Sequence, residues 1–345
     1  MARSPRRPRG VRAALRAPRG PVAALVVVLA LLVAAVAVPA AADALSGGRD
    51  APDDLRILVP NTPGGGYDVT ARSAARVLAD TGLTGPVEVF NLPGASGIAG
   101  LGRVVSERGN DRLLMSTGLG VVGSAVSRRA PVSLADTTPI ARLTEETEIV
   151  VVPAGSPHRD VGSLLAAWRA DPAGTAVGGG SSIGGPDHLA TMLVAEASGI
   201  APARVDYRVN DGGGPLLASV LRGEVAFAVS GLGEFADQIG SGDLRVLAVT
   251  AGERVPGLDV PTLRESGVDV DVVNWRGIVA PPGLAPDARA ELEGLVAAMR
   301  ATPEWQQVLR TNGWHDAWLP GAAFARFTAD ETTRVRRILG GLGLG

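Results

Sequence analysis

The sequence predicts an α/β protein with two lobes, each built on a mostly parallel sheet flanked by helices. Between residues 57 and 118, three apolar runs of strand length are each followed by small residues and then by a helical pattern. The same order starts again after residue 150. Because parallel strands joined by helices bring their following loops together at one edge of the sheet, we expect a ligand to bind at these loops. The 345 residues and 46% apolar content suffice for two such units.

Composition excludes several kinds of chemistry. The chain has no Cys, so it cannot form disulfides, thiol nucleophiles or thiolate metal ligands. All 33 basic residues are Arg, which rules out Schiff-base chemistry on a Lys side chain. His158, His188 and His315 are scattered and lack the spacing of a zinc motif. The candidate loops carry no nucleophile–base pair, so we expect a protein that is not an enzyme and that uses no metal or cofactor.

The N-terminus is typical of an export signal. Residues 1–42 contain seven Arg and no acidic residue, and residues 22–38 are 17 apolar residues in succession, followed by Pro39 and three Ala. A basic, then apolar, then small-residue order directs secretion. We therefore expect the protein to work outside the cytoplasmic membrane, with residues 43–54 as a polar linker; an uncleaved membrane anchor is the alternative. Without residues 1–42 the formal net charge changes from −2 to −9, which argues against nucleic acid as a partner.

The first strand leads into a glycine loop. The apolar run over residues 57–59 is followed by Pro63 and three glycines, and a helical pattern starts at Val69. A glycine loop before a helix directs unpaired N–H groups and the positive helix end at one point. This arrangement predicts an anion site on the backbone amides of Gly65 and Gly66. A tight turn without a ligand is the alternative.

Asp68 stands directly before this helical pattern, where an N-cap residue belongs. A carboxylate beside a bound anion would repel it. As an N-cap, however, the side chain turns toward the helix N–H groups, and Arg72, four residues further on, can pair with it on the same face. We therefore expect Asp68 to organise the loop, with direct contact to the ligand as the alternative.

Two further strands in the first half of the chain are followed by loops. Residues 87–90 predict a second strand, and a glycine-rich turn over residues 94–97 precedes a helix that extends to Val105. Residues 112–115 predict a third strand, after which Ser116 opens a third loop of small residues. The convergence of three such loops favours a ligand site more strongly than any single loop.

The pattern restarts in the second half. The apolar run over residues 149–152 predicts a crossing into a second lobe, and residues 175–177 predict a short strand. The glycine-rich segment 178–185 then precedes a helix over residues 187–197. His188 lies in the first turn of this helix, where it either contacts the ligand or has a capping or packing role.

Polar residues also follow the later strands. A short strand that closes at Tyr207 is followed by Asn210, and a strand over residues 225–229 is followed by Ser230. The acidic segment 145–148 precedes the crossing between the lobes. We expect it to be a solvated junction in preference to a catalytic cluster.

Nearly the whole chain after residue 55 is covered by segments that share one resemblance. They are PNTPGGGYDVTAR, NLPGASGIAGL, PVSLADTTPIARLTEETEIVVVPAGSP, GGGSSIGGPDHLA, VSGLGEFADQI, LRVLAVTAGERVPGLDVPTLRESGVDV, NWRGIVAPPG and TNGWHDAWL. Together they resemble the solute receptors of the tripartite tricarboxylate transporter family. The segments over residues 131–157 and 244–283 are the most specific to it.

The resemblance implies a two-lobed periplasmic-binding-protein fold, type II-like, with a ligand cleft between the lobes and two crossovers of the chain. It implies that residues 55–150 and 272–345 form lobe 1 and that residues 151–271 form lobe 2. Members of the family hold one carboxylate largely through backbone amides and ordered waters. Carried over by position, the ligand-binding residues are Asn61, Thr62, Gly65, Gly66, Tyr67, Asp68, Ser116, Ser181, Ser182, Ile183, Gly184, Asn210 and Ser230.

The resemblance also implies a function. The protein is expected to capture a small carboxylate, with a citrate-like tricarboxylate favoured, and to deliver it as a monomer to membrane permease subunits. A sensor that reports the solute to a membrane kinase would have the same sequence features and is the alternative. An enzyme of the same bilobal fold with a dipyrromethane cofactor would need a Cys, which the chain lacks.

The export signal can be tested directly. Because the basic, apolar and small-residue segments occur in the order that directs secretion, we expect the mature chain to start within a few residues of Ala42. N-terminal sequencing of the exported protein measures this. Membrane-bound protein that retains residues 22–38 would instead show an anchor.

Overall fold

A computed structural model describes residues 54–344 of the chain. The export signal expected over residues 1–42, and all but the last residue of the linker expected over residues 43–54, lie outside the described residues. Between residues 54 and 344, no helix is both long and apolar enough to cross a membrane.

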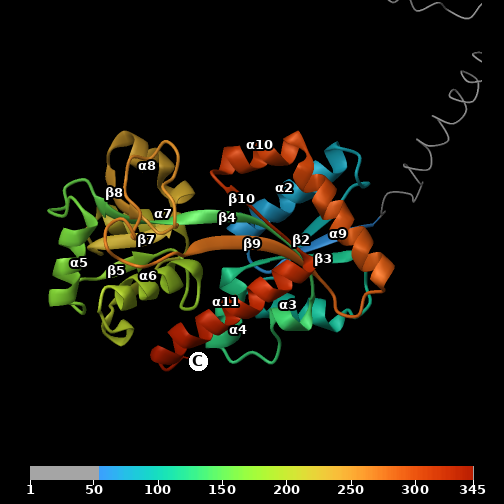
Figure 1. Ribbon diagram of the computed structural model, residues 1–345, viewed down its shortest axis with the longest axis horizontal. Helices are drawn as coiled ribbons and strands as arrows, with labels where there is room; N and C mark the ends of the chain where they lie inside the picture. The colour runs from blue at the N-terminus through green and yellow to red at the C-terminus, as the bar shows by residue number, and fades with distance from the viewer. Residues whose placement is uncertain (1–53, 345) are drawn as a thin grey trace, which may run out of the picture. The chain divides into compact units, whose positions relative to one another are not determined.

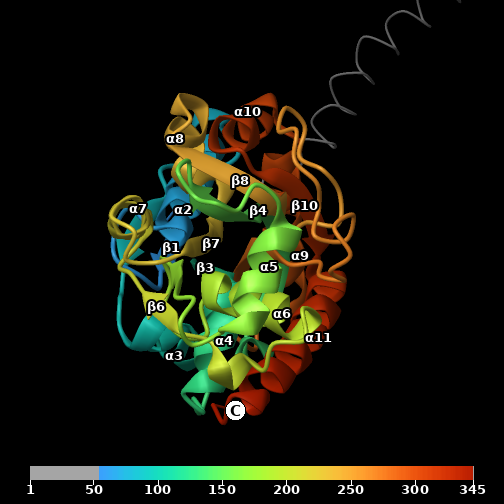
Figure 2. The same ribbon diagram turned by 90° about the vertical axis from the view of Figure 1, so that its left-hand side faces the viewer.

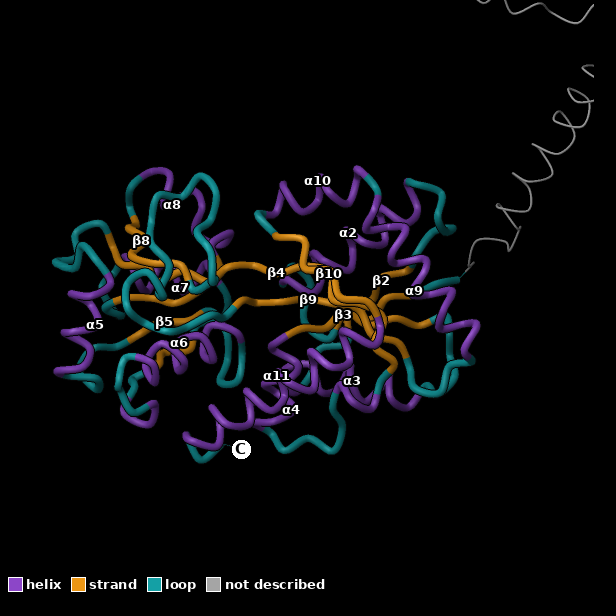
Figure 3. The backbone as a smooth tube through the Cα atoms, viewed as in Figure 1, coloured by secondary structure: helices purple, strands orange, loops and turns teal. Residues whose placement is uncertain are grey.

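The strands of the described residues join into one ten-stranded sheet (Figure 1). They are β1 (Arg56–Val59), β2 (Glu88–Asn91), β3 (Leu113–Gly118), β4 (Thr138–Pro153), β5 (Val177–Gly179), β6 (Tyr207–Val209), β7 (Phe227–Gly231), β8 (Leu244–Val249), β9 (Val273–Ala280) and β10 (His315–Pro320). The order is β2-β1-β3-β9-β4-β7-β5-β6, and β8 and β10 also pair with β4. The long strands β4 and β9 run side by side between two groups of shorter strands, as Figure 3 shows.

These two groups define two halves of the molecule. The first half contains β1, β2, β3 and β10, the second contains β5 to β8, and the chain passes between them through β4 and returns through β9. The two expected crossovers are therefore confirmed. The lobe limits at residues 150 and 271 stay a prediction, because β4 belongs to both halves.

The sheet is parallel only at its two ends. β1 pairs in parallel with β2 and β3, and β5 pairs in parallel with β6 and β7, so the βα units were predicted correctly. β4 runs antiparallel to β7, β8, β9 and β10, and β3 runs antiparallel to β9. β4 and β9 are antiparallel because β4 carries the chain out of the first half and β9 carries it back.

Helices cover both faces of this sheet (Figure 1). They are α2 (Gly66–Asp80), α3 (Ile98–Ser106), α4 (Leu119–Ser127), α5 (Val161–Ala170), α6 (Pro186–Ala197), α7 (Gly213–Leu221), α8 (Ala236–Ser241), α9 (Pro286–Ala301), α10 (Pro303–Asn312) and α11 (Gly321–Gly341). Short 3-10 turns lie at η1 (Ala95–Gly97), η2 (Leu134–Asp136), η3 (Pro202–Arg204) and η4 (Leu232–Phe235).

Alternation along the strands divides the apolar side chains between the two faces. In β1, Ile57 and Val59 pack in one cluster with α2, α9 and α10, whereas Leu58 belongs to the cluster on the opposite face with α3, α4 and α11. In β4, Ile149 belongs to the cluster of α7, whereas Val150 belongs to that of α5 and α6. The cluster that contains Leu58 and Val150 extends through both halves and so ties them together.

Several boundaries differ from the sequence prediction. β7 continues to Gly231, so Ser230 lies in this strand and does not follow it. α2 begins at Gly66, so its N-cap is Gly65 and Asp68 is the third helical residue, not the N-cap. β3 continues to Gly118, so Ser116 lies in a strand and not in a loop; the pairing of residues 115–118 with β9 overrides the turn-forming tendency of these small residues. β6 begins at Tyr207 instead of closing there.

The two halves also touch outside the sheet. The backbone of Gly123 in α4 approaches that of Gly184 in the loop before α6 so closely that a Cβ atom at Gly123 would overlap the carbonyl oxygen of Gly184. In Figure 2, which looks onto the second half, α11 lies alongside α6. Arg337 of α11 donates to Glu196 of α6 at 2.7 Å.

The Gly123 contact predicts a stability effect. We expect Gly123→Ala to lower the free energy of unfolding by about 1–3 kcal/mol, because the loop at Gly184 must move away. Gly102→Ala is the matched control: Gly102 is also inside a helix but has nothing within 4 Å of its would-be Cβ atom, so Ala there should stabilise by about 0.5–1 kcal/mol. Urea unfolding of both variants measures this. Equal stability changes would mean that the halves do not meet at Gly123.

Candidate ligand-binding cleft

A cavity of ≈ 540 Å³ opens where strands from both halves end, and we call it the cleft. Segments that follow β1, β2, β3, β5, β6 and β7 line it, together with residues of β9. The lining residues are Pro60, Asn61, Thr62, Gly64, Gly65, Gly66, Tyr67, Ser96, Gly97, Gly120, Ser124, Gly180, Ser181, Ser182, Gly185, Pro186, Asp187, Asp211, Gly212, Glu234, Asn274 and Arg276. The carboxyl ends of the parallel strands thus converge, as expected for an α/β binding site.

The start of α2 offers backbone donors to the cleft. Gly64 has a φ of +88°, which favours glycine, and the first hydrogen bond of the helix runs from Val69 N to Gly65 O at 3.0 Å. The N–H groups of Gly66 and Tyr67 precede that bond, so they have no partner within the helix. Together with the positive end of the helix dipole, these amides make a site for an anion.

The loop before α6 has a backbone conformation similar to that of the loop before α2, but it has fewer free backbone N–H groups. Gly184 has a φ of +84°, and Leu189 N donates to Gly185 O at 2.9 Å to open the helix. Pro186 has no N–H group to offer, and the N–H of Asp187 donates to Ser181 Oγ at 3.1 Å. The start of α6 therefore presents fewer free amides to the cleft than the start of α2.

A side chain in the first turn of each helix fixes the preceding glycine. The N–H of Gly64 donates to Asp68 Oδ2 at 3.0 Å, and at the equivalent position the N–H of Gly184 donates to His188 Nδ1 at 3.3 Å. Burial lowers the pKa of His188 to about 4, so the ring is neutral and can accept this bond. The ring also packs edge-on against Tyr207, with 4.9 Å between ring centres. His188 thus has the packing role, and it does not line the cleft.

Asp68 is held away from the cleft. Its carboxylate also accepts from Arg72 Nε at 3.0 Å and from Asn91 Nδ2 at 2.9 Å, which confirms the expected pairing with Arg72. Although burial alone raises the pKa of a carboxyl group, the hydrogen bonds from Arg72, Gly64 and Asn91 hold the pKa of Asp68 below its usual value. Asp68 therefore organises the loop.

Tyr67 fills the cleft wall between α2 and the start of α4. A Cβ atom at Gly120 would lie 2.9 Å from its hydroxyl oxygen, so any other residue there would force this hydroxyl to shift. Burial raises the pKa of Tyr67 to about 12, against the lowering effects of Arg276 and of hydrogen bonds from the backbone of Val121 and Gly120.

Arg276 is the cation of the cleft. It lies in β9 with 6% of its surface exposed, and its Nη2 donates to Glu146 of β4 at 2.6 Å. Its guanidinium lies 4.9 Å from the ring centre of Trp314. The Nη1 atom is buried without a hydrogen-bond partner among the described residues. A buried donor without a partner is costly, so an acceptor that reached Nη1 would be stabilised there.

Acidic side chains gather on the opposite side of the cleft. Asp187 is 7% exposed, and its Oδ2 accepts from Gly180 N at 2.7 Å and from Ser230 Oγ at 2.8 Å. Burial raises the pKa of Asp187, and of Glu148 behind it still more strongly. Glu234 is exposed to the open cleft, yet desolvation there, followed by the charges of Asp187 and Glu146, raises its pKa to about 7.

The structure brings together seven of the residues expected from the sequence: Asn61, Thr62, Gly65, Gly66, Tyr67, Ser181 and Ser182 line the cleft. The other six are not among the lining residues. Asp68 and Gly184 fix the two loops from behind, and Ser230 donates to Asp187. Ser116 is fully buried in β3, Ile183 is 48% exposed, and Asn210 donates to Gly179 O at 3.4 Å, just after β6.

The expected solvated junction over residues 145–148 was wrong for Glu146 and Glu148, which are 7% and 1% exposed. They alternate along β4 with Glu145 and Thr147, which point into a second cavity. Glu146 and Glu148 stand two positions apart directly before the apolar run over residues 149–152, and this spacing, which puts both on one face of a strand, was the signal in the sequence. Arg276, Asp187 and Glu234 were also missed as lining residues, because each stands alone in its segment.

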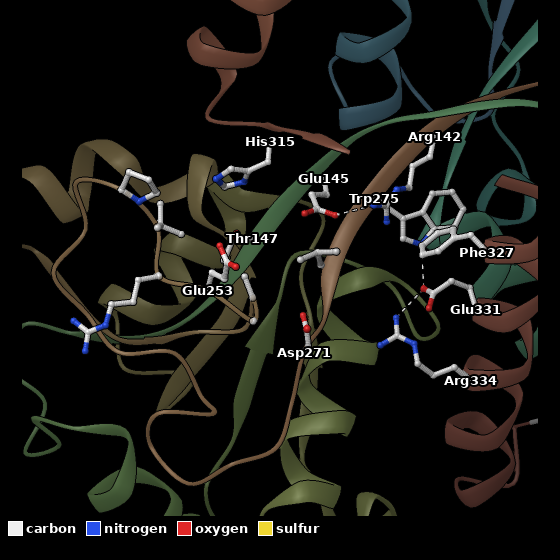
Figure 4. A pocket seen from close by; sticks show the side chains of 16 residues that line it. Arg142, Glu145, Thr147, Glu253, Asp271, Trp275, His315, Phe327, Glu331 and Arg334 are labelled. Carbon is white, nitrogen blue, oxygen red and sulfur yellow. Dashed lines mark hydrogen bonds and ion pairs between the residues drawn. The ribbon is translucent and has the colours of Figure 1, made fainter. Parts of the chain in front are cut away.

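The second cavity, of ≈ 660 Å³, lies on the other face of the crossing strands (Figure 4). Val273 and Trp275 of β9 line it, whereas Asn274 and Arg276 line the cleft. Four of its charged residues form two ion pairs: Arg142 with Glu145 at 3.4 Å, and Arg334 with Glu331 at 2.7 Å. This cavity is larger, but the cleft contains the glycine loops, the helix start and the unpaired Nη1 atom, so the cleft is the candidate site. Between residues 54 and 344, no group of three or more His, Asp or Glu could hold a metal ion.

Two βα halves joined by two strands around a polar cleft are the architecture of a solute-binding receptor. The sequence model described as "Tripartite tricarboxylate transporter family receptor" matches residues 70–344. The chain belongs to this family, whose members are solute-binding receptors and not enzymes.

Individual relatives agree with this membership. The chain is 30% identical to Protein BugT of Bordetella pertussis, over 67% of this chain and 72% of that protein. It is 29% identical to the UPF0065 protein in the tcbD-tcbE intergenic region of a Pseudomonas species, over 82% and 84%. A crystal structure of a TctC solute-binding protein from Polaromonas, without ligand, matches with a TM-score of 0.69 and 26% identity, over 83% of this chain and 97% of that one.

Two ligand-bound structures share the fold. MatC from Rhodopseudomonas palustris, with bound malate, has a TM-score of 0.70 at 23% identity over 83% of this chain and 98% of that one. An R. palustris protein with adipate has a TM-score of 0.72 at 24% identity over 84% and 97%.

The role of Asp68 predicts a pH-dependent stability effect. Asp68→Asn should lower the free energy of unfolding by about 1–3 kcal/mol at neutral pH, because it weakens the bonds to Gly64 and Arg72. The pKa is lowered in the folded state, so this contribution is present above the unfolded pKa and is lost as the pH falls through the folded pKa. Chemical unfolding at neutral and acidic pH measures the difference. Asp80→Asn, at an exposed acid of the same helix, should change stability by less than about 0.5 kcal/mol; a loss as large as that of Asp68→Asn would contradict the role.

Proposed function

We propose that this protein captures a small carboxylate outside the cytoplasmic membrane and delivers it, as a monomer, to the permease of a tripartite tricarboxylate transporter. The observation that supports this most directly is Arg276, a buried cation that lines the cleft beside the start of α2 and whose Nη1 atom has no hydrogen-bond partner among the described residues.

The geometry favours a carboxylate at this point. A Cβ atom at Gly66 would lie 2.7 Å from Arg276 Nη2, so the guanidinium lies directly against the first turn of α2. An anion held here receives charge-assisted hydrogen bonds from Arg276 and further bonds from the amides of α2. These fixed donors replace the water that the anion loses on entering the cleft, which would otherwise cost several kcal/mol.

The acidic residues that line the cleft bear on how many carboxylate groups the ligand carries. Malate and adipate, bound in the two structures of similar fold, each have two carboxylates. The citrate-like ligand expected from the sequence would bring a third carboxylate close to Asp187, Asp211 and Glu234, which also line the cleft. Like charges at short range repel, so we propose a ligand of lower net negative charge than a tricarboxylate.

Thermal unfolding of the purified protein against a panel of carboxylates tests the proposal. We expect one or a few acids to stabilise the protein, by about 2.7 kcal/mol at 100 times the dissociation constant, and to be recovered unchanged. Gly66→Val should abolish this gain, because the new side chain would displace Arg276. Gly102→Val, where nothing lies within 4 Å, should keep it. Unchanged affinity in Gly66→Val would place the ligand elsewhere, and turnover of any stabilising acid would contradict a receptor.

A further inference from the structure

The carboxylate site on α2 and Arg276 leaves the acidic side of the cleft without a function. Asp187 and Glu234 line the cleft there, and Ser230 Oγ lies 2.8 Å from Asp187 Oδ2 and 3.2 Å from Glu234 Oε2. A hydroxyl group has one hydrogen, so Ser230 can donate to only one of the two carboxylates at a time. The two acids are therefore close together and share a single donor.

No cation of the described residues balances these acids. Glu146 and Glu148 of β4 lie behind them, and neither Asp187 nor Glu234 forms an ion pair between residues 54 and 344. The charge of Arg276 in β9 acts on Glu234, but Arg276 is already paired with Glu146 at 2.6 Å. The chain has no Lys that could be recruited. Two carboxylates facing one cavity without a counter-charge repel each other unless a proton or a bound cation separates them.

The two similar loops place opposite charge preferences at the two ends of the cleft. Gly64 and Gly184, with φ of +88° and +84°, occupy equivalent positions, and the third residue after each is Tyr67 in one loop and Asp187 in the other. The α2 end thus combines free amides with the unpartnered Nη1 of Arg276. The α6 end has lost one amide to Pro186 and carries a buried carboxylate.

We propose that the ligand carries an ammonium group as well as a carboxylate, and that Asp187 and Glu234 bind the ammonium while Arg276 and the start of α2 bind the carboxylate. This inference rests on the proposed function and specifies its substrate class. Arg276 lines the same cleft, is 6% exposed and has an Nη1 atom without a hydrogen-bond partner among the described residues, which is the independent sign that a charged ligand enters beside these acids. An ammonium group supplies three donors, enough to serve both carboxylates at once.

The arrangement would also give selectivity. An acid without the amino group fills the α2 end but leaves Asp187 and Glu234 facing each other without a partner. A site with polar groups that stay unpaired discriminates strongly against the ligand that lacks the matching group. The amino derivative of an acid should therefore bind more tightly than the acid itself.

Calorimetric titration of the purified protein with matched pairs tests this. The pairs are succinate with aspartate, glutarate with glutamate, and adipate with 2-aminoadipate. At about pH 8 we expect the amino member of at least one pair to bind about tenfold more tightly or better, which corresponds to about 1.4 kcal/mol. Asp187→Asn keeps an acceptor for Gly180 and Ser230, so the fold should survive while the preference falls to about threefold or less. Glu145→Gln, on the other face of β4, should leave the preference unchanged.

The pH dependence of ligand binding shows whether a bound ammonium group or a proton reduces the repulsion between Asp187 and Glu234. Because desolvation and the neighbouring charges of Asp187 and Glu146 raise the pKa of Glu234 to about 7, Glu234 becomes negatively charged between about pH 6 and pH 8. With a bound ammonium, the preference for the amino member should grow over this range. If protonated acids instead donate to a second carboxylate, the diacids should bind more tightly at the lower pH and without preference, which would overturn the inference.

The outcomes also separate this inference from the proposed function. If the diacids bind and their amino derivatives bind no more tightly, the ammonium site is wrong while the carboxylate receptor stands. If the Asp187→Asn variant keeps the preference of the unsubstituted protein for the amino member, the ammonium site is likewise wrong. If no member of any pair or of the wider carboxylate panel binds, the proposed function fails and the inference fails with it.

Discussion

The buried ion pair between Arg276 and Glu146 is the interaction on which the cleft depends. It joins β9 to β4, the two strands that carry the chain between the halves, with 2.6 Å between Nη2 and Oε2. Removing one member of a buried pair leaves an uncompensated charge, which is strongly destabilising, so neither residue can change alone. The pair also holds the guanidinium of Arg276 against the start of α2, in the wall of the cleft, while Nη1 has no hydrogen-bond partner among the described residues. One interaction therefore contributes to the junction of the halves and also orients the main cation of the cleft.

Much of the remaining cleft wall is backbone, because side chains would fill the space. Gly66 leaves room for Arg276, and Gly120 leaves room for the hydroxyl of Tyr67. Gly123 allows the loop before α6 to approach α4. A ligand in the cleft would therefore meet peptide groups whose directions are set by helices, and such groups lose little freedom on binding. The abundance of glycine in the chain has this specific cause at the cleft, whereas elsewhere many glycines occupy turns with positive φ.

The parts of the structure that depend on local patterns could be predicted from the sequence. The apolar run over residues 57–59, the glycine loop and the following helix identified β1, α2 and their anion site, because strand, turn and helix signals are all local. Arg276 and Glu146 could not be paired in this way, since 130 residues separate them and the register of β4 against β9 decides their contact. Ser116 was assigned to a loop for the same reason: only its pairing with β9 shows that the strand continues. Long-range strand pairing is thus the information that the sequence alone did not supply.

The loops before α2 and α6 differ in a way that would let the cleft bind a ligand in one orientation. Gly64 and Gly184 have nearly the same backbone, and each is fixed by a side chain four residues further on, Asp68 or His188. A cleft with identical loops would present the same partial charges from both sides and could not orient a ligand with two different ends. Asp187 in place of Tyr67, and Pro186 in place of Gly66, reverse the charge preference at one end without altering the loop. Because the backbone is retained and only the side chains differ, the two ends of the cleft can differ in charge while the loop conformation stays the same.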